Sequence, residues 1–291
     1  MTQAPEDPQP ARPGKDRYDY FGISHQGLVR TENQDCFLIG SIHKAMQVHQ
    51  TSLPEETLGE LVSPSRGYVF LVADGVGGIP GGKDASRTAL GAIIDYVLRA
   101  MDLYVRLDQD QEPAFLAELQ RSVERSHEAV RKAGAADDER LGMATTLTMV
   151  CIRWPRGYLV HVGDSRCYVL RDGQLNLLTK DQTMAQAMVD AGALSPDQAE
   201  RSGLKHVLYS AIGAMRAEPM TVTTDIQLND IMLLCTDGVT KHVSDDEIRD
   251  ALLACDSSEK TARDLVQLAL DRGGSDNTTL IIGRYKPANE G

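Results

Sequence analysis

The stretch Tyr68-Val69-Phe70-Leu71-Val72-Ala73-Asp74-Gly75-Val76-Gly77-Gly78 joins an apolar run to an aspartate and a glycine-rich turn. The run Tyr68–Ala73 is typical of a strand, so Asp74 is expected where this strand ends. Glycine lets the backbone approach a site closely. The side chain of Asp74 and the carbonyl of Gly75 can therefore face one site at the edge of a sheet.

Two more segments place an aspartate beside an apolar run: Cys235-Thr236-Asp237-Gly238, which follows such a run, and Ser275-Asp276-Asn277, which precedes one. An unpaired carboxylate against a hydrophobic strand is costly. Carboxylates that converge without basic partners repel one another, and a hard divalent cation is the usual remedy. Asp74, Asp237 and Asp276 therefore predict a site for magnesium or manganese.

The charge and the hydropathy of the chain narrow the class of partner. The 291 residues carry a formal net charge of -12, whereas nucleic acids and anionic membranes are bound by clustered Lys and Arg. No apolar run approaches the roughly 18 to 20 residues of a membrane helix. The segment 1–16 is rich in proline without an apolar core, unlike a secretion signal. We expect a cytoplasmic protein with no nucleic-acid or membrane partner.

The cysteines do not indicate a disulfide framework or a zinc site. Their number is odd and Cys-x-x-Cys spacing is missing among Cys36, Cys151, Cys167, Cys235 and Cys255. Cys235 precedes Asp237 closely enough to recruit zinc, but packing in a strand is the favoured interpretation. All five are expected to be reduced and buried.

Periodicity predicts blocks of strands separated by pairs of helices. Strands are expected at 18–23, 36–39, 68–73, 145–152, 158–162, 167–170, 174–178, 231–235 and 279–285, with an Arg-Asp-Gly hairpin turn after residue 170. Helices are expected at 85–104, 114–133, 245–254 and 258–271, the third beginning with a capping box of Ser244 and Glu247. This order predicts an α+β fold in which two packed antiparallel sheets are flanked by helical layers, an α-β-β-α sandwich.

Six short motifs occur along the chain in a recognisable order: Arg30-Thr31-Glu32-Asn33-Gln34-Asp35, Asp74-Gly75-Val76-Gly77-Gly78, Gly142-Met143-Ala144-Thr145-Thr146, Gly163-Asp164-Ser165-Arg166, Thr236-Asp237-Gly238 and Ser275-Asp276-Asn277. In this order and context they resemble the metal-dependent protein phosphatases, the PPM or type 2C family, and its bacterial serine/threonine phosphatase branch in particular. Each motif alone is weak, since Asp-Gly is a common turn. The resemblance extends over nearly all of the chain after residue 16.

The resemblance implies a role for each carboxylate of the three segments. Asp74 would bridge two metal ions, and the carbonyl of Gly75 would ligate the second. Asp237 and Asp276 would ligate the first ion. Asn277 is expected to hold its loop through bonds from its side chain to the backbone rather than to bind metal.

Three further residues are implied on the same ground. Asp35 would join the metal site through bound water, and Arg30 would anchor the phosphate, since a guanidinium offers a planar fork of donors. Asp164 would hold a third, weaker ion together with Asp237. For Asp164 the alternative is a buried partner of a nearby arginine or backbone amide, and Asp181 is expected to be structural.

Two bound divalent ions can hold a shared water, lower its pKa and aim it in line at phosphorus. Together with the resemblance, this implies a manganese- or magnesium-dependent phosphatase of phosphoserine and phosphothreonine in proteins. The resemblance alone implies partners that include a serine/threonine kinase or its substrates. The alternative is a catalytically weak regulatory module that binds phosphoproteins, although the complete carboxylate set speaks against it. A metal nuclease lacks the necessary basic surface.

The identity of a general acid is left open. Animal relatives carry a histidine directly after the bridging Asp-Gly, where this chain has Val76. Neither His161 nor His206 is assigned this role, since a single histidine is more often structural.

The domain organisation follows from the same elements. A single domain is expected at 17–286, preceded by a disordered proline-rich tail, 1–16, and followed by a second tail, 287–291. Residues 41–66 form an insertion longer than a hairpin needs. Residues 184–213 match the flap that overhangs the site in bacterial relatives, with a short helix beginning at Ser195-Pro196.

Overall fold

The computed structural model describes residues 18–43, 67–76, 81–99 and 111–285. Both predicted tails and the insertion after residue 43 lie outside the described residues. Strand β2 (Cys36–Ile42) continues past residue 41, because Ile42 pairs with Gly67 at the start of β3 (Gly67–Ala73). Residue 41 was therefore the wrong boundary for the insertion: pairing across the sheet extends this strand.

The first sheet contains five antiparallel strands in the order β1-β10-β9-β6-β7. Their bounds are β1 (Tyr18–His25), β6 (Arg166–Arg171), β7 (Gln174–Leu177), β9 (Ile231–Cys235) and β10 (Thr278–Tyr285). Asp172 and Gly173 connect β6 to β7 with φ angles of 49° and 77°. Positive φ at both central positions is the geometry of a tight hairpin, so the predicted Arg-Asp-Gly turn is confirmed.

The second sheet is also antiparallel and has the order β2-β3-β4-β5-β8. It adds β4 (Leu147–Arg153), β5 (Arg156–Val162) and β8 (Met220–Asp225). Strand β8 was missed from the sequence, because its threonines break up any apolar run. It is a half-exposed edge strand that pairs with the buried β5, so tertiary pairing rather than local pattern determines it.

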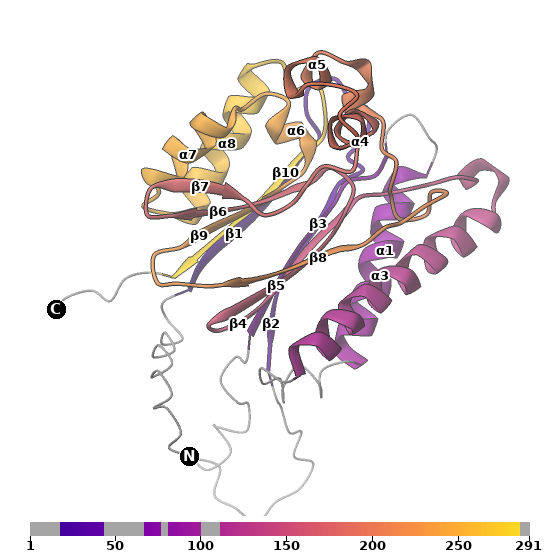
Figure 1. Cartoon of the computed structure of the whole chain (residues 1–291), viewed down its shortest axis with the longest axis horizontal. Helices are drawn as coiled ribbons and strands as arrows, with labels where there is room; N and C mark the ends of the chain where they lie inside the picture. Colours follow the sequence, from indigo (N-terminus) through magenta and orange to yellow (C-terminus); the bar gives the residue numbers. More distant parts are fainter. Residues whose placement is uncertain (1–17, 44–66, 77–80, 100–110, 286–291) are drawn as a thin grey trace, which may run out of the picture.

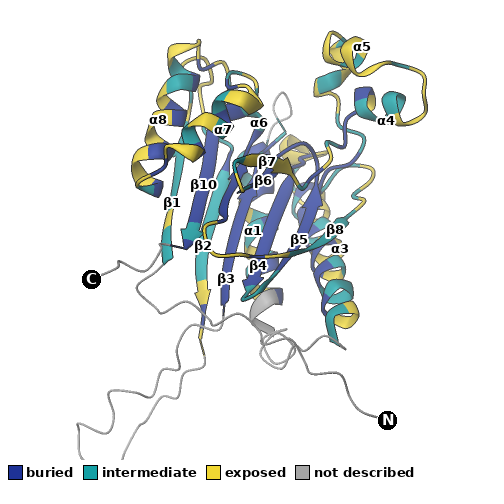
Figure 2. Ribbon diagram, turned by 60° about the vertical axis from the view of Figure 1, so that its left-hand side comes forward, coloured by how far each residue is buried: buried dark blue, intermediate teal, exposed yellow. Residues whose placement is uncertain are grey.

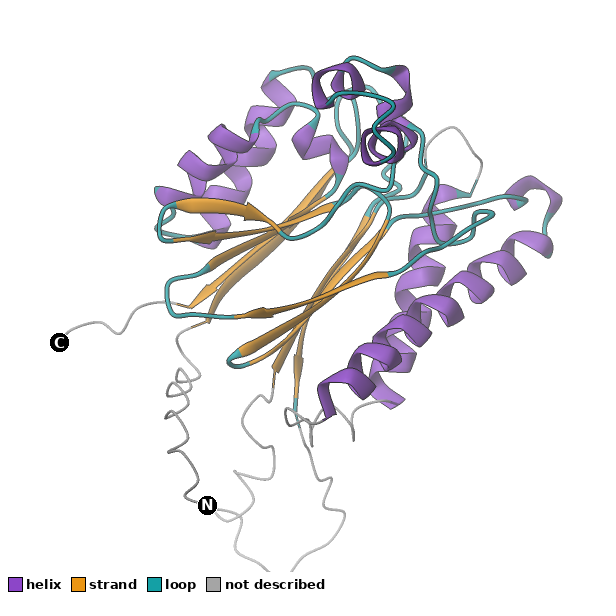
Figure 3. Cartoon of the chain, in the orientation of Figure 1, coloured by secondary structure: helices purple, strands orange, loops and turns teal. Residues whose placement is uncertain are grey.

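Helices cover the outer face of each sheet, and Figures 1 and 3 show the four layers edge-on. Helices α1 (Gly82–Arg99) and α3 (Glu112–Ala135) pack on the second sheet, while α7 (Asp245–Leu253) and α8 (Ser258–Asp271) pack on the first. The capping box of Ser244 and Glu247 is present. The predicted α-β-β-α sandwich is thus confirmed, and the part of the first predicted helix beyond residue 99 lies outside the described residues.

The strand that carries Asp74 is buried on both faces. Leu71 packs with residues of α1 and α3, whereas Phe70 and Val72 pack between the sheets with Leu234 and Ile281. Alternate residues of a strand point to opposite faces, so an unbroken apolar run is what a strand between two cores requires. Figure 2 shows the central strands as buried and the outer helical surfaces as exposed.

Short helices gather at the end of the sandwich where these strands terminate (Figure 1). They are α4 (Met184–Asp190), α5 (Pro196–Glu200), η5 (Gly203–His206) and α6 (Asp237–Thr240); η4 (Asp138–Arg140) follows α3. The helix predicted at Ser195-Pro196 is confirmed as α5, which Ser195 caps with Gln198. None of the helices within the described ranges has both the length and the apolar character needed to cross a bilayer.

Candidate metal centre

Asp74, Asp237 and Asp276 come together from the ends of three strands. Asp74 follows β3 of the second sheet, Asp237 follows β9 of the first sheet and begins α6, and Asp276 stands two residues before β10. All three line one cleft with a volume of about 510 Å³. The structure therefore brings together the segments that the sequence paired.

Close contact between loops explains the glycine after each of two aspartates. A Cβ on Gly238 would stand 1.8 Å from the carbonyl oxygen of Asn277, and a Cβ on Gly75 would stand 2.5 Å from the carbonyl group of Gly82. Real side chains do not tolerate such distances, so only glycine lets these backbones meet. The second half of each Asp-Gly pair is what allows the loops to converge.

The backbone of Asp74 is held by the threonines of the Gly142–Thr146 motif. Its carbonyl accepts hydrogen bonds from the Thr145 hydroxyl and the Thr146 amide, both at 2.8 Å, and its amide donates to the Thr146 hydroxyl. The Thr146 hydroxyl also lies 2.7 Å from that of Ser165 in the Gly163–Arg166 motif. These two motifs therefore help to hold Asp74 in place.

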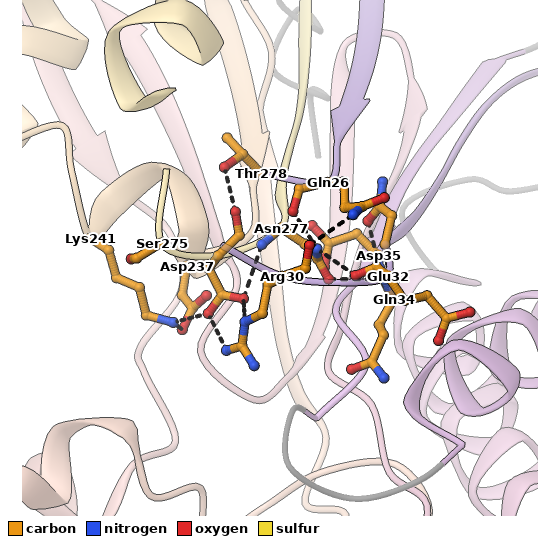
Figure 4. A network of polar contacts seen from close by, with 12 residues as sticks. Gln26, Arg30, Glu32, Gln34, Asp35, Asp237, Lys241, Ser275, Asn277 and Thr278 are labelled. Carbon is orange, nitrogen blue, oxygen red and sulfur yellow. Dashed lines mark hydrogen bonds and ion pairs between the residues drawn. The ribbon is translucent and has the colours of Figure 1, made fainter. Parts of the chain in front are cut away.

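Asn277 ties the loop of Arg30 and Asp35 to the loop of Asp276, as Figure 4 shows. Its side-chain amide donates to the carbonyls of Gln26 and Glu32 at 2.8 and 2.9 Å, and its side-chain oxygen accepts from the amide of Gln34. The expectation that Asn277 fixes a loop is confirmed.

Two basic side chains approach the carboxylates. The guanidinium of Arg30 binds both oxygens of Asp276, with Nε 2.7 Å from Oδ1 and an Nη 2.9 Å from Oδ2. Lys241 Nζ lies 2.6 Å from Oδ2 of Asp237 and 2.6 Å from Oδ2 of Asp276. Sequence reasoning assumed carboxylates without basic partners, which is wrong for these two residues.

Lys241 is the residue of the site that sequence reasoning missed. It follows Asp237 by four positions, and its amide donates to the Asp237 carbonyl as α6 ends. Residues four apart share one face of a helix. A lysine four residues after a predicted metal ligand was therefore the signal available in the sequence. Burial lowers the pKa of Lys241, but attraction to Asp237 and Asp276 outweighs this effect and raises the pKa overall. Lys241 therefore stays positively charged at neutral pH.

The other carboxylates are buried and crowded. Burial raises the pKa of Asp35 to about 6 and that of Asp164 to about 8, and repulsion from Asp237 adds to both. The pKa of Asp74 is well above its usual value, first through burial and then through repulsion from Asp35 and its other acidic neighbours. For Asp276, the hydrogen bonds from Arg30 and Lys241 overcome burial and lower the pKa.

Two oxygens indicate that the site suits a divalent cation. Oδ1 of Asp35 and Oδ1 of Asp237 are buried, and neither has a hydrogen-bond partner among the described residues. An orphaned buried carboxylate oxygen is costly unless a cation binds it. Within the described ranges no three acidic, histidine or cysteine side chains are arranged so that they could hold a metal ion as they stand, and Lys241 lies between two of the carboxylates. Carboxylate oxygens are the donors that a hard divalent ion prefers, so the residues present fit such an ion.

The remaining candidate residues differ in whether they line the cleft or stabilise the fold around it. Arg30, Gly75, Asp164 and His206 line the cleft, whereas Asp35 lines a separate pocket with Glu32 and Lys83. His161 is fully buried, with its ring nitrogens against the Thr148 hydroxyl and the Gly163 carbonyl. Asp181 makes a two-point ion pair with Arg166. Both His161 and Asp181 are thus structural.

A profile of the family described as protein phosphatase 2C matches residues 57–271 of this chain. The serine/threonine protein phosphatase PstP of Mycobacterium tuberculosis is 31% identical over 264 residues, which make up 90% of this chain and 44% of that protein. The protein phosphatase PhpP of Streptococcus pneumoniae is 28% identical over 215 residues, 74% of this chain and 84% of PhpP. The chain thus spans under half the length of its Mycobacterium relative.

Solved structures share the whole fold. A crystal structure of the Mycobacterium tuberculosis phosphatase PstP/Ppp superposes with a TM-score of 0.73 at 29% identity, over 93% of this chain and 100% of that one. The catalytic domain of PstP in complex with two manganese ions has a TM-score of 0.70 at 30% identity, over 93% and 99% of the two chains. A serine/threonine phosphatase of S. agalactiae, at 24% identity and a TM-score of 0.75, shares the fold.

Proposed function

This chain belongs to the protein phosphatase 2C family, and from that premise we propose that it is a metal-dependent phosphatase acting on phosphoserine and phosphothreonine in proteins. One observation supports this most: Asp74, Asp237 and Asp276 meet in one cleft beside Arg30. Carboxylates for cations and a guanidinium for a phosphoryl group are the two requirements of phosphate-ester hydrolysis by metal ions.

The metal ions are assigned to residues of both sheets. Asp74 and the Gly75 carbonyl would hold two ions between them, Asp237 and Asp276 would ligate the first, and Asp35 would join through water. Asp164 and Asp237 would hold a third, weaker ion. When bound, manganese or magnesium would supply an activated water and neutralise charge that develops on the phosphoryl group. The two manganese ions in the structure of the PstP catalytic domain support a pair of ions here.

Residues of the chain itself would orient the phosphoryl group and form an apolar wall beside it. Arg30 is held by two bonds to Asp276, and its guanidinium lines the cleft where phosphoryl oxygens would bind. Val207, Leu208, Ala211 and Ala214 form an apolar wall of the same cleft, within and directly after the predicted flap. Such a wall excludes water from the reacting group and strengthens the electrostatic interactions there.

The wider setting is also part of the proposal. Residues 17–286 would form one domain, and the substrates would include a serine/threonine kinase or proteins phosphorylated by one. The five cysteines are free, four of them buried and Cys36 half-buried. Free cysteines support a reducing compartment such as the cytoplasm.

The function is tested by phosphate release from a phosphothreonine peptide with manganese, with magnesium and with EDTA. We expect release with a divalent ion and none with EDTA. A second rise in rate, at metal concentrations above those that saturate the first two sites, would support the third ion at Asp164. Peptide binding with no release under either metal would instead favour the regulatory phosphoprotein-binding module.

Arg30→Ala is expected to raise the KM for the phosphopeptide roughly 10- to 100-fold, because a charged pair of hydrogen bonds to the phosphoryl group is lost. Manganese affinity should not weaken, because Arg30 is not an assigned metal ligand and its loss removes a positive charge from Asp276. Steady-state kinetics and calorimetry measure the two quantities separately. An unchanged KM would remove Arg30 from the phosphate site.

A further inference from the structure

We propose that Lys241 is a tethered cation that takes the place of a metal ion between Asp237 and Asp276, so that a divalent ion must displace its ammonium group to bind. This inference rests on the proposed metal site and adds an internal competitor to it. The competitor is part of the chain and is therefore present at a fixed effective concentration.

The contact geometry carries the inference. A single atom, Lys241 Nζ, lies 2.6 Å from one oxygen of each of the two aspartates. Both oxygens thus share the Lys241 ammonium, although Oδ2 of Asp276 also accepts from Arg30, and they belong to the residues assigned to the first metal ion. An ammonium and a metal ion cannot occupy the space between the same two oxygens together.

The surroundings hold the lysine in this position. Its side chain is 24% exposed, and those of Asp237 and Asp276 are 18% and 15% exposed. The two ion pairs of Lys241 are therefore protected from the solvent screening that weakens surface ion pairs. The helical turn of α6 places Lys241 and Asp237 on one face. Figure 4 shows the lysine extended toward Asp237.

Other charges near the carboxylates do not have this arrangement. Arg30 contacts Asp276 alone, from a side chain that is 41% exposed. Lys83 pairs with Glu32 at 2.7 Å, on the side of the neighbouring Asp35. Among the charged residues described, Lys241 is the one that bridges two assigned ligands of the same ion.

The consequence is a lower apparent affinity for metal. When only a fraction of molecules is competent to bind, the apparent dissociation constant rises by the inverse of that fraction. An ammonium in place in roughly nine molecules of ten would weaken manganese binding about tenfold. The same lysine stabilises the metal-free protein, because it neutralises carboxylates that would otherwise repel one another.

Calorimetric titration of the full chain with manganese alone tests the proposal. Lys241→Met keeps the length of the side chain and removes its charge, and Lys83→Met is the matched control for a nearby charge that does not bridge the ligands. We expect Lys241→Met to bind manganese at least about tenfold more tightly than the wild type and Lys83→Met to remain within about twofold. Equal or weaker binding by Lys241→Met would overturn the proposal.

Thermal unfolding provides an independent readout. In EDTA, Lys241→Met should unfold at a lower temperature than the wild type, and saturating manganese should raise its Tm by more than it raises that of the wild type. Lys241→Gln, which retains a donor for the carboxylates, serves if the methionine variant does not fold without metal. An equal manganese-induced rise in Tm would contradict displacement. If neither the wild type nor the variants bind manganese, the metal site itself fails, which is a different result from equal binding by all.

Discussion

Asp237→Asn is expected to reduce turnover of a phosphothreonine peptide by roughly 10³-fold, about 4 kcal/mol of transition-state stabilisation. The surroundings of the two oxygens of Asp237 explain this expectation. One of its oxygens is buried without a partner among the described residues, and the other binds Lys241. An amide offers a single neutral oxygen, so manganese affinity should fall on the order of 100-fold. Kinetics at saturating manganese and calorimetry measure these losses.

The matched control for this change is Asp264→Asn. Asp264 is exposed on α8 and pairs with Lys260 at 2.9 Å, so the same change of chemistry is made at a side chain that is not among those lining the cleft. Turnover and metal affinity should both remain at the wild-type values there. Because asparagine has nearly the volume of aspartate, Asp237→Asn should keep the fold, which circular dichroism would verify. Wild-type kinetics in Asp237→Asn would refute its assignment as a ligand.

Gly238→Ala is expected to destabilise the protein by about 3 kcal/mol, because its new methyl group would overlap the carbonyl oxygen of Asn277. For a domain of this size that corresponds to a fall in Tm of roughly 6–12 °C. Relief of the overlap must separate the two loops that carry Asp237 and Asp276. Manganese affinity should therefore decrease along with stability, and differential scanning calorimetry with and without manganese would detect both effects.

Gly91→Ala provides the contrast. Gly91 lies in α1, and a Cβ there would meet no atom within 4 Å. Alanine favours a helix over glycine, so this variant should be more stable by about 0.5–1 kcal/mol with unchanged metal affinity. If Gly238→Ala proved as stable as Gly91→Ala, close packing of the two loops would not be what requires glycine at position 238.

The elements that the sequence predicted well are those in which local pattern and burial agree. The run that precedes Asp74 is buried on both faces, so its apolar residues identify it without knowledge of its neighbours. Strand β8 is the counterexample, because its half-exposed threonines acquire their strand only by pairing with β5. Boundaries behave likewise: β2 extends to Ile42 because Gly67 lies opposite.

Some features of the site could likewise be predicted from the sequence, and others could not. The sequence by itself determined which residue types stand where strands end: the three aspartates, the glycines beside two of them and the asparagine after the third. Charge and turn chemistry are properties of neighbours along the chain, so these features can be inferred from the order of residues. Family membership followed from the same motifs.

Tertiary structure alone decided which charges face one another. Lys241 is near Asp237 in sequence, but its contact with Asp276 joins positions 35 residues apart, and the bond of Arg30 to Asp276 joins positions 246 apart. Likewise, the sequence showed a glycine at 238, while only the folded loops show the carbonyl of Asn277 pressed against it. Electrostatic and steric interactions act through space, and the distances that govern them are established only when the two sheets pack together.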